Sequence, residues 1–240
     1  MPDPSATLIG AMQFSASTAS LDVTSVTVAA GQVLLVPIIY VQGLSNPASV
    51  AWDPAGVNEA LTLLKRQRED GATGIAVDWW VRLNPTPGAA KTITVTNGDV
   101  IQCAAAAVGI ADANTGSLAA FVRDTTLTGG TADSNGTASD PATVTVADVI
   151  SGDLVLDVLV AQTSANPDTG QIALIDNITS GQQFGVSWKA GVLGGVMSWL
   201  KEGGGTQQWA IAAMAIKAVA AAAGPLPFRT SSVARLVGPG

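Results

Sequence analysis

The chain has 240 residues, and its 18 acidic residues outnumber its 11 basic residues to give a net charge of −7. A chain of this length forms one large β domain or two small ones, and it buries about 70% of its unfolded surface without covalent help. The sequence has no histidine and a single cysteine, Cys103, which excludes a Ser-His-Asp triad, most zinc sites and an internal disulfide.

The amino-terminal residues, MPDPSATLIGAMQF, lack the basic start and the apolar run of a signal peptide. The apolar run at residues 33–41 has nine residues, which is too short to span a bilayer. We therefore expect a soluble protein that has no membrane partner. The sequence also has no basic patch that would neutralise phosphates, so no nucleic-acid partner is expected. The first strand is expected at residues 7–15.

Alternation of apolar and polar residues predicts strands in the first half of the chain. Residues 60–70, ALTLLKRQRED, are interpreted as a strand rather than a helix. In VDWWVRL, residues 77–83, Trp79 falls on the apolar face and Trp80 on the face that carries Asp78 and Arg82. In KTITVTN, residues 91–97, the isoleucine and the valine face inward and the threonines face outward.

The last predicted strand lies at residues 207–218, QQWAIAAMAIKA, where both faces are apolar or small. This pattern is typical of a central strand that is covered on two sides. Turn-forming residues interrupt the chain about every ten residues, as in the strand spacing of sandwiches and barrels. No segment of 12 or more residues keeps the apolar spacing of a helix. The sequence therefore predicts an all-β fold.

Two parts of the chain resemble each other in order and spacing. VTVAAGQVLLVPII (26–39) is similar to VTVADVISGDLVLDVLV (144–160), which places Gly31 over Gly152, and a second match places Trp80 over Trp199. This pattern indicates two similar halves, residues 8–123 and 143–218, joined by the turn-rich residues 124–142. The alternative is that strands rich in valine and alanine resemble one another through composition alone.

A longer series of strand patterns resembles a loose group of tailed-phage and prophage virion structural proteins. The series consists of Val50-Ala51-Trp52, Leu61-Thr62-Leu63, Trp80 to Pro85 with Gly88, Thr92 to Thr96, Ala107 to Ile110, Gly152 to Val155, Met197-Ser198-Trp199 and Trp209 to Ala212. The resemblance covers residues 8–217 and implies a jelly-roll-like antiparallel β-sandwich within a virion, such as a head-decoration protein. It brings no catalytic residues.

Candidate reactive or binding residues have simpler explanations. Asp133, Asn135 and Asp140 in the loop 131–140 would supply oxygen ligands for calcium, but Asn135-Gly136 is a strong turn signal, so a surface turn is favoured. The pairs Asp153 with Asp157 and Glu69 with Asp70 are expected by chance. Cys103 lies in the apolar stretch IQCAAAAV and is expected to be buried and inert.

The six tryptophans raise the possibility of sugar platforms, for which two of them qualify. Trp80 lies beside charged residues and Trp188 lies close to a turn, whereas Trp79 is expected in the core. A core or subunit-interface position remains the better interpretation for both Trp80 and Trp188.

The carboxy-terminal residues 217–240 contain three basic residues and no acid, which leaves a charge of −10 on the rest of the chain. We predict a β-sandwich domain at residues 1–218 followed by an extended arm at residues 219–240. The arm residues expected to contact a neighbouring subunit are apolar anchors and two arginines: Phe228, Arg229, Val233, Arg235 and Leu236. The alternative is a solvated chain end.

These observations predict a non-enzymatic phage virion protein that decorates or cements the head or its vertices and is assembled in the host cytoplasm. Its expected partners are copies of itself, in a ring such as a trimer or pentamer, and the major capsid protein or another virion protein. No cofactor or metal is expected. The alternative function is a carbohydrate-binding jelly-roll module of a tail fibre or another receptor-binding component; a glycosidase is less favoured.

Overall fold

The computed structural model describes residues 3–41, 47–68, 74–123, 131–136, 141–191, 195–201 and 208–219. These residues form strands and one short helix. Within them there is no helix with the length and apolar character that a bilayer crossing requires. The elements are β1 (Ser5–Val28), β2 (Val33–Val41), β3 (Pro47–Trp52), β4 (Glu59–Ala60), β5 (Thr62–Arg68), β6 (Ala76–Arg82), β7 (Gly88–Ala111), α1 (Leu118–Phe121), β8 (Thr131–Gly136), β9 (Ala142–Val146), β10 (Leu154–Ala161), β11 (Ala165–Pro167), β12 (Ile172–Thr179), β13 (Gln182–Ala190), β14 (Gly195–Lys201) and β15 (Trp209–Ile216).

The first sheet nearly closes into a six-strand barrel. Its strands follow the order β4-β3-β7-β2-β6-β5, and β1 pairs with β7 outside this path. Leu61 alone separates β4 from β5, and its backbone N–H donates to the Val50 carbonyl of β3 at 2.9 Å. The two ends of the sheet are therefore joined by one continuous stretch of chain.

The barrel depends on a sharp irregularity in the long strand β7. The partner of Thr18 in β1 is Ile101, whereas the partner of Ser20 is Thr96, so β7 carries extra residues at this point. Such bulges bend a strand and let it pass from one sheet layer to another. Asn97-Gly98, a dipeptide that usually signals a turn, lies in this bulge within β7 instead of ending the strand.

Two smaller antiparallel sheets make up the second part of the chain. One has the order β12-β13-β10-β15-β8 and the other the order β11-β14-β9. Strands β10 and β15 are buried along their whole length, as is β2 in the first sheet. The expectation of a central strand at residues 207–218 is confirmed by β15, which lies between β10 and β8.

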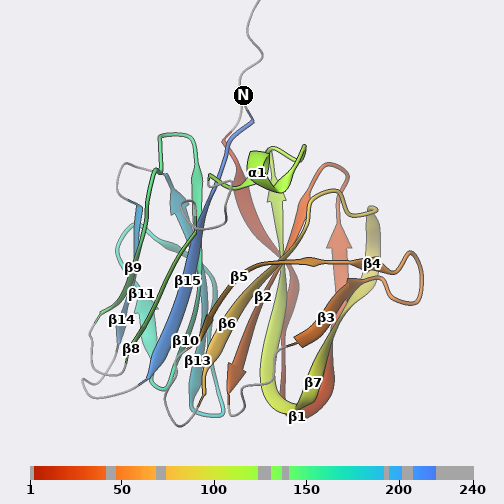
Figure 1. The fold of residues 1–240 in the computed structure, drawn as a ribbon, viewed down its shortest axis with the longest axis horizontal. Coiled ribbons are helices and arrows are strands. Elements are labelled where there is room, and N and C mark those ends of the chain that lie inside the picture. Colours follow the sequence, from red (N-terminus) through yellow and green to blue (C-terminus); the bar gives the residue numbers. More distant parts are fainter. Residues whose placement is uncertain are drawn as a thin grey trace, which may run out of the picture.

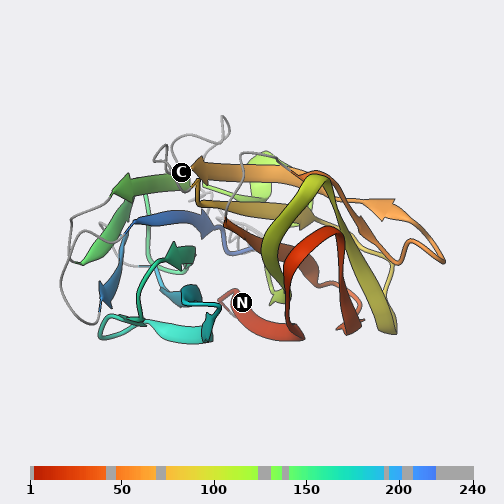
Figure 2. The same cartoon turned by 90° about the horizontal axis from the view of Figure 1, so that it is seen from below.

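The strands form four layers with three apolar cores between them (Figure 1). The outer layers are β9, β11 and β14 on one side and β3, β4 and the adjoining parts of β1 and β7 on the other. Figure 2 shows the two parts of the chain side by side. Alternate residues of β2 divide between two cores: Leu35 lies in the core shared by the two parts, and Leu34 lies in the barrel interior.

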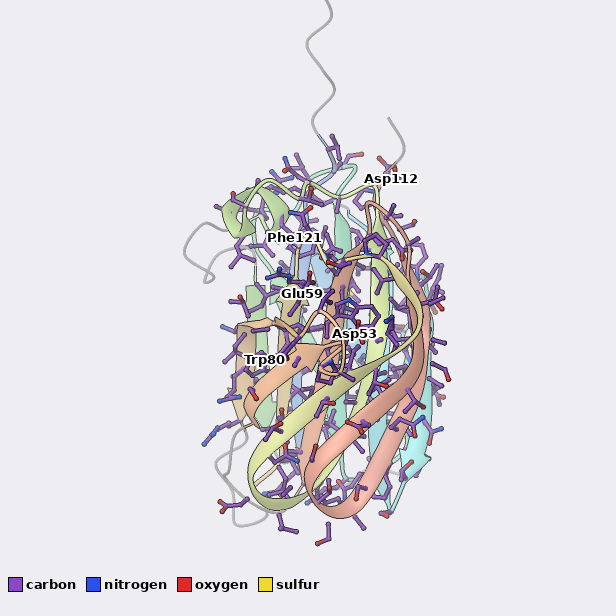
Figure 3. The ribbon with its side chains drawn as sticks, turned by 90° about the vertical axis from the view of Figure 1, so that its right-hand side faces the viewer. Asp53, Glu59, Trp80, Asp112 and Phe121 are labelled. Carbon is purple, nitrogen blue, oxygen red and sulfur yellow. The ribbon has the colours of Figure 1, made fainter. Side chains whose placement is uncertain are left out.

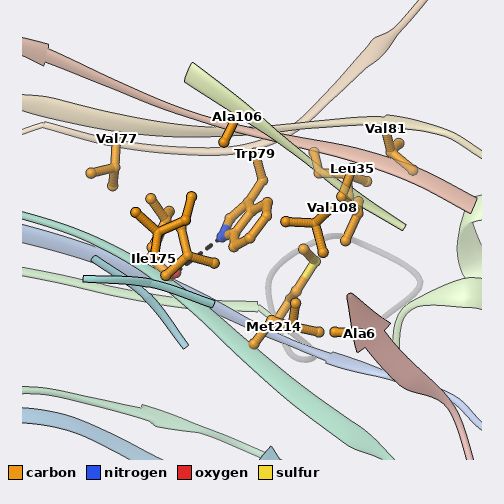
Figure 4. Close-up of a cluster of buried hydrophobic side chains, with 14 of the residues drawn as sticks. Ala6, Leu35, Val77, Trp79, Val81, Ala106, Val108, Ile175 and Met214 are labelled. Carbon is orange, nitrogen blue, oxygen red and sulfur yellow. Dashed lines mark hydrogen bonds between the residues drawn. The ribbon is translucent and has the colours of Figure 1, made fainter. Parts of the chain in front are cut away.

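Trp79 anchors the core shared by the two parts of the chain. Its side chain is fully buried, and its indole N–H donates to the Ala212 carbonyl of β15 at 3.1 Å. Figure 4 shows this bond with Val108 and Met214 packed beside the ring. The predicted apolar face of residues 77–83 is therefore confirmed, and it packs against the second part of the chain.

The strand pairing of residues 5–111 recurs in residues 131–216. In the first part β2 pairs with β6 and β7, β6 with β5, and β3 with β7; in the second part β10 pairs with β13 and β15, β13 with β12, and β11 with β14. The pairing of β1 with β7 recurs as β8 with β15 and β9 with β14. The second part therefore repeats the connectivity of the first with interrupted long strands.

The two sequence matches between these parts differ in outcome. Gly31 and Gly152 lie in corresponding turns, before β2 and before β10, with φ of 80° and 92°. Trp80 lies in β6, whereas Trp199 lies in β14, whose corresponding segment is the first part of β7. Strand β8 lies ahead of the predicted second half, 143–218. The domain boundaries remain predictions.

The expected all-β antiparallel fold is confirmed, and residues 62–68 form a strand as predicted. The first strand is longer than expected, because β1 continues through residues 16–28. The strand order does not show a jelly roll. The proposed arm beyond Val219 lies outside the described residues.

Candidate functional site

The described chain ends at Val219 in a cleft of about 460 Å³ at one end of the sheets. Three segments meet there: the chain that surrounds α1, the turn before β10, and the residues after β15. The lining residues are Asn114, Ala120, Arg123, Ile150, Ser151, Asp153, Lys217, Ala218 and Val219. We call this feature the end cleft.

Helix α1 is held in one position at the end cleft. The Ser117 side chain accepts a hydrogen bond from the Ala120 N–H at 3.1 Å, as an N-terminal cap does. Phe121 is fully buried in the shared core, and its carbonyl accepts from the Lys217 N–H at 2.8 Å. Figure 3 shows Phe121 and Asp112 toward the same end of the molecule. The chain after the first sheet is thus fixed onto the second.

An ion pair forms one wall of the cleft. Arg123 Nε donates to Asp153 Oδ2 at 2.9 Å, and the Arg123 Nη2 donates to the other carboxylate oxygen. The Asp153 side chain is only 1% exposed, and it also accepts from the Ile150 N–H at 3.0 Å. Because both carboxylate oxygens are bonded, this pair fixes the turn before β10 rather than offering a reactive group.

Exposed carboxylates lie near the end cleft, whereas the charged residues of its lining are Arg123, Lys217 and Asp153. Ile150 is 51% exposed although it lines the cleft. Asp112 and Asp148 are exposed in the adjoining turns, and exposed Asp3 has its Oδ1 atom 3.4 Å from where a Cβ of Gly152 would lie. Ile150 is therefore an exposed apolar contact in a lining with two basic residues and one acid, and further carboxylates are exposed in the adjoining turns.

The other described clusters of charged groups serve the interior of the protein. In the barrel, fully buried Asp78 accepts from Arg66 Nε at 2.7 Å, from the Tyr40 hydroxyl at 3.1 Å and from Trp80 Nε1 at 3.2 Å. Burial and the charge of Asp78 raise the pKa of Tyr40 well above its usual value. The phenol therefore stays protonated as a hydrogen-bond donor.

A second fully buried carboxylate, Asp157, lies between β10 and the outer three-stranded sheet. Its Oδ1 accepts from the Ser187 N–H at 2.9 Å and from the Ser187 hydroxyl at 2.7 Å, and its Oδ2 accepts from Trp199 Nε1 at 2.7 Å. Burial raises the pKa of Asp157 to about 7, although these hydrogen bonds and the charge of Lys189 act to lower it. Asp153 and Asp157, whose proximity in sequence was attributed to chance, therefore do not act as a pair. Asp153 fixes the turn before β10, and Asp157 accepts hydrogen bonds from Ser187 and Trp199.

A smaller cleft of about 280 Å³ lies on another side of α1 and is lined in part by Arg82, Asn84 and Leu118. Glu59 accepts from Arg82 Nε at 3.2 Å and from the Thr86 hydroxyl at 2.6 Å. Burial raises the pKa of Glu59, but these bonds and the charge of Arg82 outweigh it and hold the pKa below its usual value. Glu59 is therefore an ionised structural carboxylate.

The structure can be compared with the predictions for the loop 131–140 and for Cys103. Residues 131–136 form β8, so the expected surface turn at Asn135-Gly136 is wrong, and Asp140 lies outside the described residues. No cluster of three or more Cys, Asp or Glu side chains that would hold a metal occurs in the part of the chain that the structure describes. Cys103 is buried as expected, and burial raises the pKa of its thiol.

The preferred core position of Trp80 is confirmed. Its side chain is 8% exposed inside the barrel, so it offers no sugar platform. Asp78 and Trp80 turn inward because the sheet rolls onto itself, whereas the Arg82 side chain remains 41% exposed. Trp188 is half-buried against the shared core and remains a candidate contact.

The predicted arm residues Phe228, Arg229, Val233, Arg235 and Leu236 lie outside the described residues. The sequence did not indicate Arg123, Ile150 or the ion pair that Asp153 forms with Arg123. The turn signal ISGD, residues 150–153, was visible, but its partner Arg123 lies 30 residues earlier, and no local pattern joins the two. Comparisons with known protein families, curated proteins and solved structures find no match to this chain.

Proposed function

We propose that this protein is a non-enzymatic structural component of a bacteriophage virion, of the head decoration or cement type. One observation carries the proposal: a layered body with a net negative charge ends its described part at Val219 in a cleft, and the 21 residues that follow contain two arginines and no acid. A basic segment attached to an acidic body is suited to joining one copy to the next.

The described charged groups support adhesion rather than catalysis. Asp78, Asp153 and Asp157 are each bonded to donors of the protein itself. A hydrolase of the two-carboxylate type requires both groups to face a substrate cleft. These three instead hold strands and turns in place, as a rigid scaffold for contacts requires.

Self-association is part of the proposal. Copies with a net charge of −7 repel one another, and the arm supplies the opposite charge. Val233 and Leu236 add apolar anchors, each worth about 1.5–3 kcal/mol when fully buried, against roughly 1 kcal/mol for each arginine pair. The apolar anchors therefore dominate the binding, and added salt weakens it only in part. The resemblance to jelly-roll-like virion proteins belongs to the same proposal.

The test uses purified virions and undecorated particles. Mass spectrometry of virions is expected to detect the protein at a fixed copy number relative to the major capsid protein. Deletion of residues 230–240 is expected to leave the melting temperature of the body unchanged and to abolish co-sedimentation. Leu236→Ala is expected to weaken co-sedimentation more than Arg235→Ala. Absence from virions, or full binding by the truncated chain, contradicts the proposal.

A carbohydrate-binding module is the alternative, and the half-buried position of Trp188 favours it. All six tryptophans lie within the described residues, and the other five are buried. A glycan that binds with sub-millimolar affinity and is lost in Trp188→Ala, with the fold retained, supports this alternative over the decoration function.

A further inference from the structure

The arm repeats a sequence pattern that surrounds α1. The first copy has Gly116, Leu118, Phe121 and Arg123, and the second has Gly224, Leu226, Phe228 and Arg229 in the same order with slightly shorter spacing. Each copy follows the last strand of its sheet, β7 in the first case and β15 in the second. The repeated strand pairing therefore extends to the segments that leave the sheets.

The first copy of this pattern shows what such a segment does. Phe121 enters the shared core, and Arg123 bonds Asp153 while its backbone N–H donates to the Ala215 carbonyl at 3.0 Å. An apolar anchor followed by an arginine thus fixes the chain at the end of the sheets. The second copy carries the same anchor and arginine.

The end cleft provides the space for the second copy. Val219, the last described residue, lines the cleft, so residues 220–229 start at its rim. The cleft volume of about 460 Å³ lies within the range that buries small ligands, and Ile150 offers an exposed apolar contact in it. Attachment to Val219 also gives this segment a high effective concentration at the cleft.

The exposed charges near the end cleft also favour the arm of the same chain as its occupant. Asp3, Asp112 and Asp148 are exposed around this end, while residues 220–240 contain Arg229 and Arg235 and no acid. Pro225 and Pro227 restrict the segment, so ordering it on the body loses less conformational entropy than ordering a glycine-rich linker would. The apolar contact, the charge and the point of attachment thus agree.

We infer that residues 224–229 of each chain dock in the end cleft of the same chain, with Leu226 and Phe228 against Ile150 and Arg229 toward the exposed carboxylates of the adjoining turns. The docked segment sets the direction in which residues 230–240 leave the body. This inference does not require a virion; it identifies the part of the arm that belongs to the body and the part that remains for a neighbour.

Trypsin cleavage of the full chain tests the inference, because Arg229 and Arg235 stand in the two parts of the same arm. Docking is expected to slow cleavage after Arg229 about tenfold relative to cleavage after Arg235, since the docked segment must open first. A synthetic peptide of residues 220–240 gives the ratio of the two rates without a body. Initial rates are measured by mass spectrometry of the released peptides.

Two isoleucines of similar exposure supply matched variants. Ile150 is 51% exposed in the end cleft, and Ile178 is 55% exposed on β12. Ile150→Asp and, separately, Phe228→Ala are expected to restore the peptide ratio, whereas Ile178→Asp is expected to keep the protection. Thermal melting checks that each variant is folded.

Three results overturn the inference. The first is a wild-type cleavage ratio equal to that of the free peptide, and the second is protection that survives Ile150→Asp in a folded protein. The third is protection that disappears on dilution over a hundredfold range of concentration, which assigns the cleft to a neighbour's arm. None of these results depends on particle binding, so the virion proposal is judged separately by co-sedimentation.

Discussion

The barrel interior and the interior behind β10 each enclose one fully buried carboxylate, but they satisfy it differently. Asp78 in the barrel contacts the Arg66 guanidinium, whose side chain is 20% exposed. Asp157 accepts hydrogen bonds from Ser187 and Trp199, which are neutral. The barrel therefore compensates its buried charge with an opposite charge, whereas the second interior relies on neutral donors.

The buried carboxylates of the two parts, Asp78 and Asp157, lie on strands that do not correspond to each other. Val36 and Asp157 each lie five residues after a turn glycine, and their cross-strand partners are Trp80 and Ser187. In the barrel the carboxylate lies on β6 instead of β2. The same strand framework thus holds a buried acid at either of two places, provided that donors converge on it.

The largest expected effect comes from breaking the ion pair in the barrel. Arg66→Ala leaves Asp78 buried without its cation, which costs about 3–5 kcal/mol of unfolding free energy. Urea denaturation measures the loss. Lys91→Ala is the control, because the Lys91 side chain is 41% exposed and its pair with Asp53 at 3.1 Å contributes less than about 1 kcal/mol. Equal losses in the two variants contradict the assigned role of the buried pair.

The second interior is expected to show a dependence on pH. With its pKa raised to about 7, folded Asp157 holds a proton that the unfolded chain releases near pH 4. The unfolding free energy therefore falls as pH rises from about 4 to 7 and then levels, by up to about 4 kcal/mol.

Asp157→Asn removes this contribution, so the variant gains stability relative to the wild type as pH increases through the window. Denaturation curves at pH 4, 5.5, 7 and 8 measure the difference between the two proteins. A difference that is the same at every pH contradicts the raised pKa.

A smaller effect is expected where Trp199 fills the second interior. A Cβ on Gly185 would lie 2.5 Å from the Trp199 ring, so Gly185→Ala forces the indole to move away from Asp157. Overpacking of this kind costs about 1–3 kcal/mol. Gly116→Ala is the control, because its Cβ would meet its nearest neighbour at 3.4 Å. Thermal melting that shows no difference between the two variants contradicts the close packing.

The smallest effect concerns the turns that the two parts share. Gly31 and Gly152 have φ of 80° and 92°, a region that side chains disfavour. Gly31→Ala and Gly152→Ala are each expected to lose about 1–2 kcal/mol of unfolding free energy, by similar amounts. Denaturation of the two variants under one condition compares them. If one turn tolerates alanine without loss, the two turns are not equivalent.

The strands of this protein are predictable from sequence because their alternation is local. Trp79 and Val81 were assigned to an apolar face, and both lie in the shared core. The core position preferred for Trp80 is also confirmed, but alternation alone does not indicate it, because burial of this second face depends on a sheet that rolls over. Asp78 makes that face look solvated, whereas in the barrel it is bonded to Arg66 of the neighbouring strand.

The end cleft was less predictable than the strands. Phe121 and Arg123 lie in a segment without strand alternation, and their partners come from the turn before β10 and from β15. Asn97-Gly98 illustrates the same limit, because a strong turn signal became a bulge within β7 once β1 had paired on both sides of it. Local signals identify where the chain bends, and tertiary pairing decides what the bend becomes.

The pairing of β1 with β7 also determines when the first sheet can fold during translation. Val28 pairs with Gly88 and Ser5 with Ala111, so each residue of β1 waits for a partner made at least 60 residues later. At about 5–20 residues per second, this delay lasts several seconds on the ribosome. Residues 4–21 carry no charge, so for that time an unpaired strand without charged residues is exposed to pairing with other chains. Synthesis of the chain is nearly half complete before its first strand is paired along its whole length.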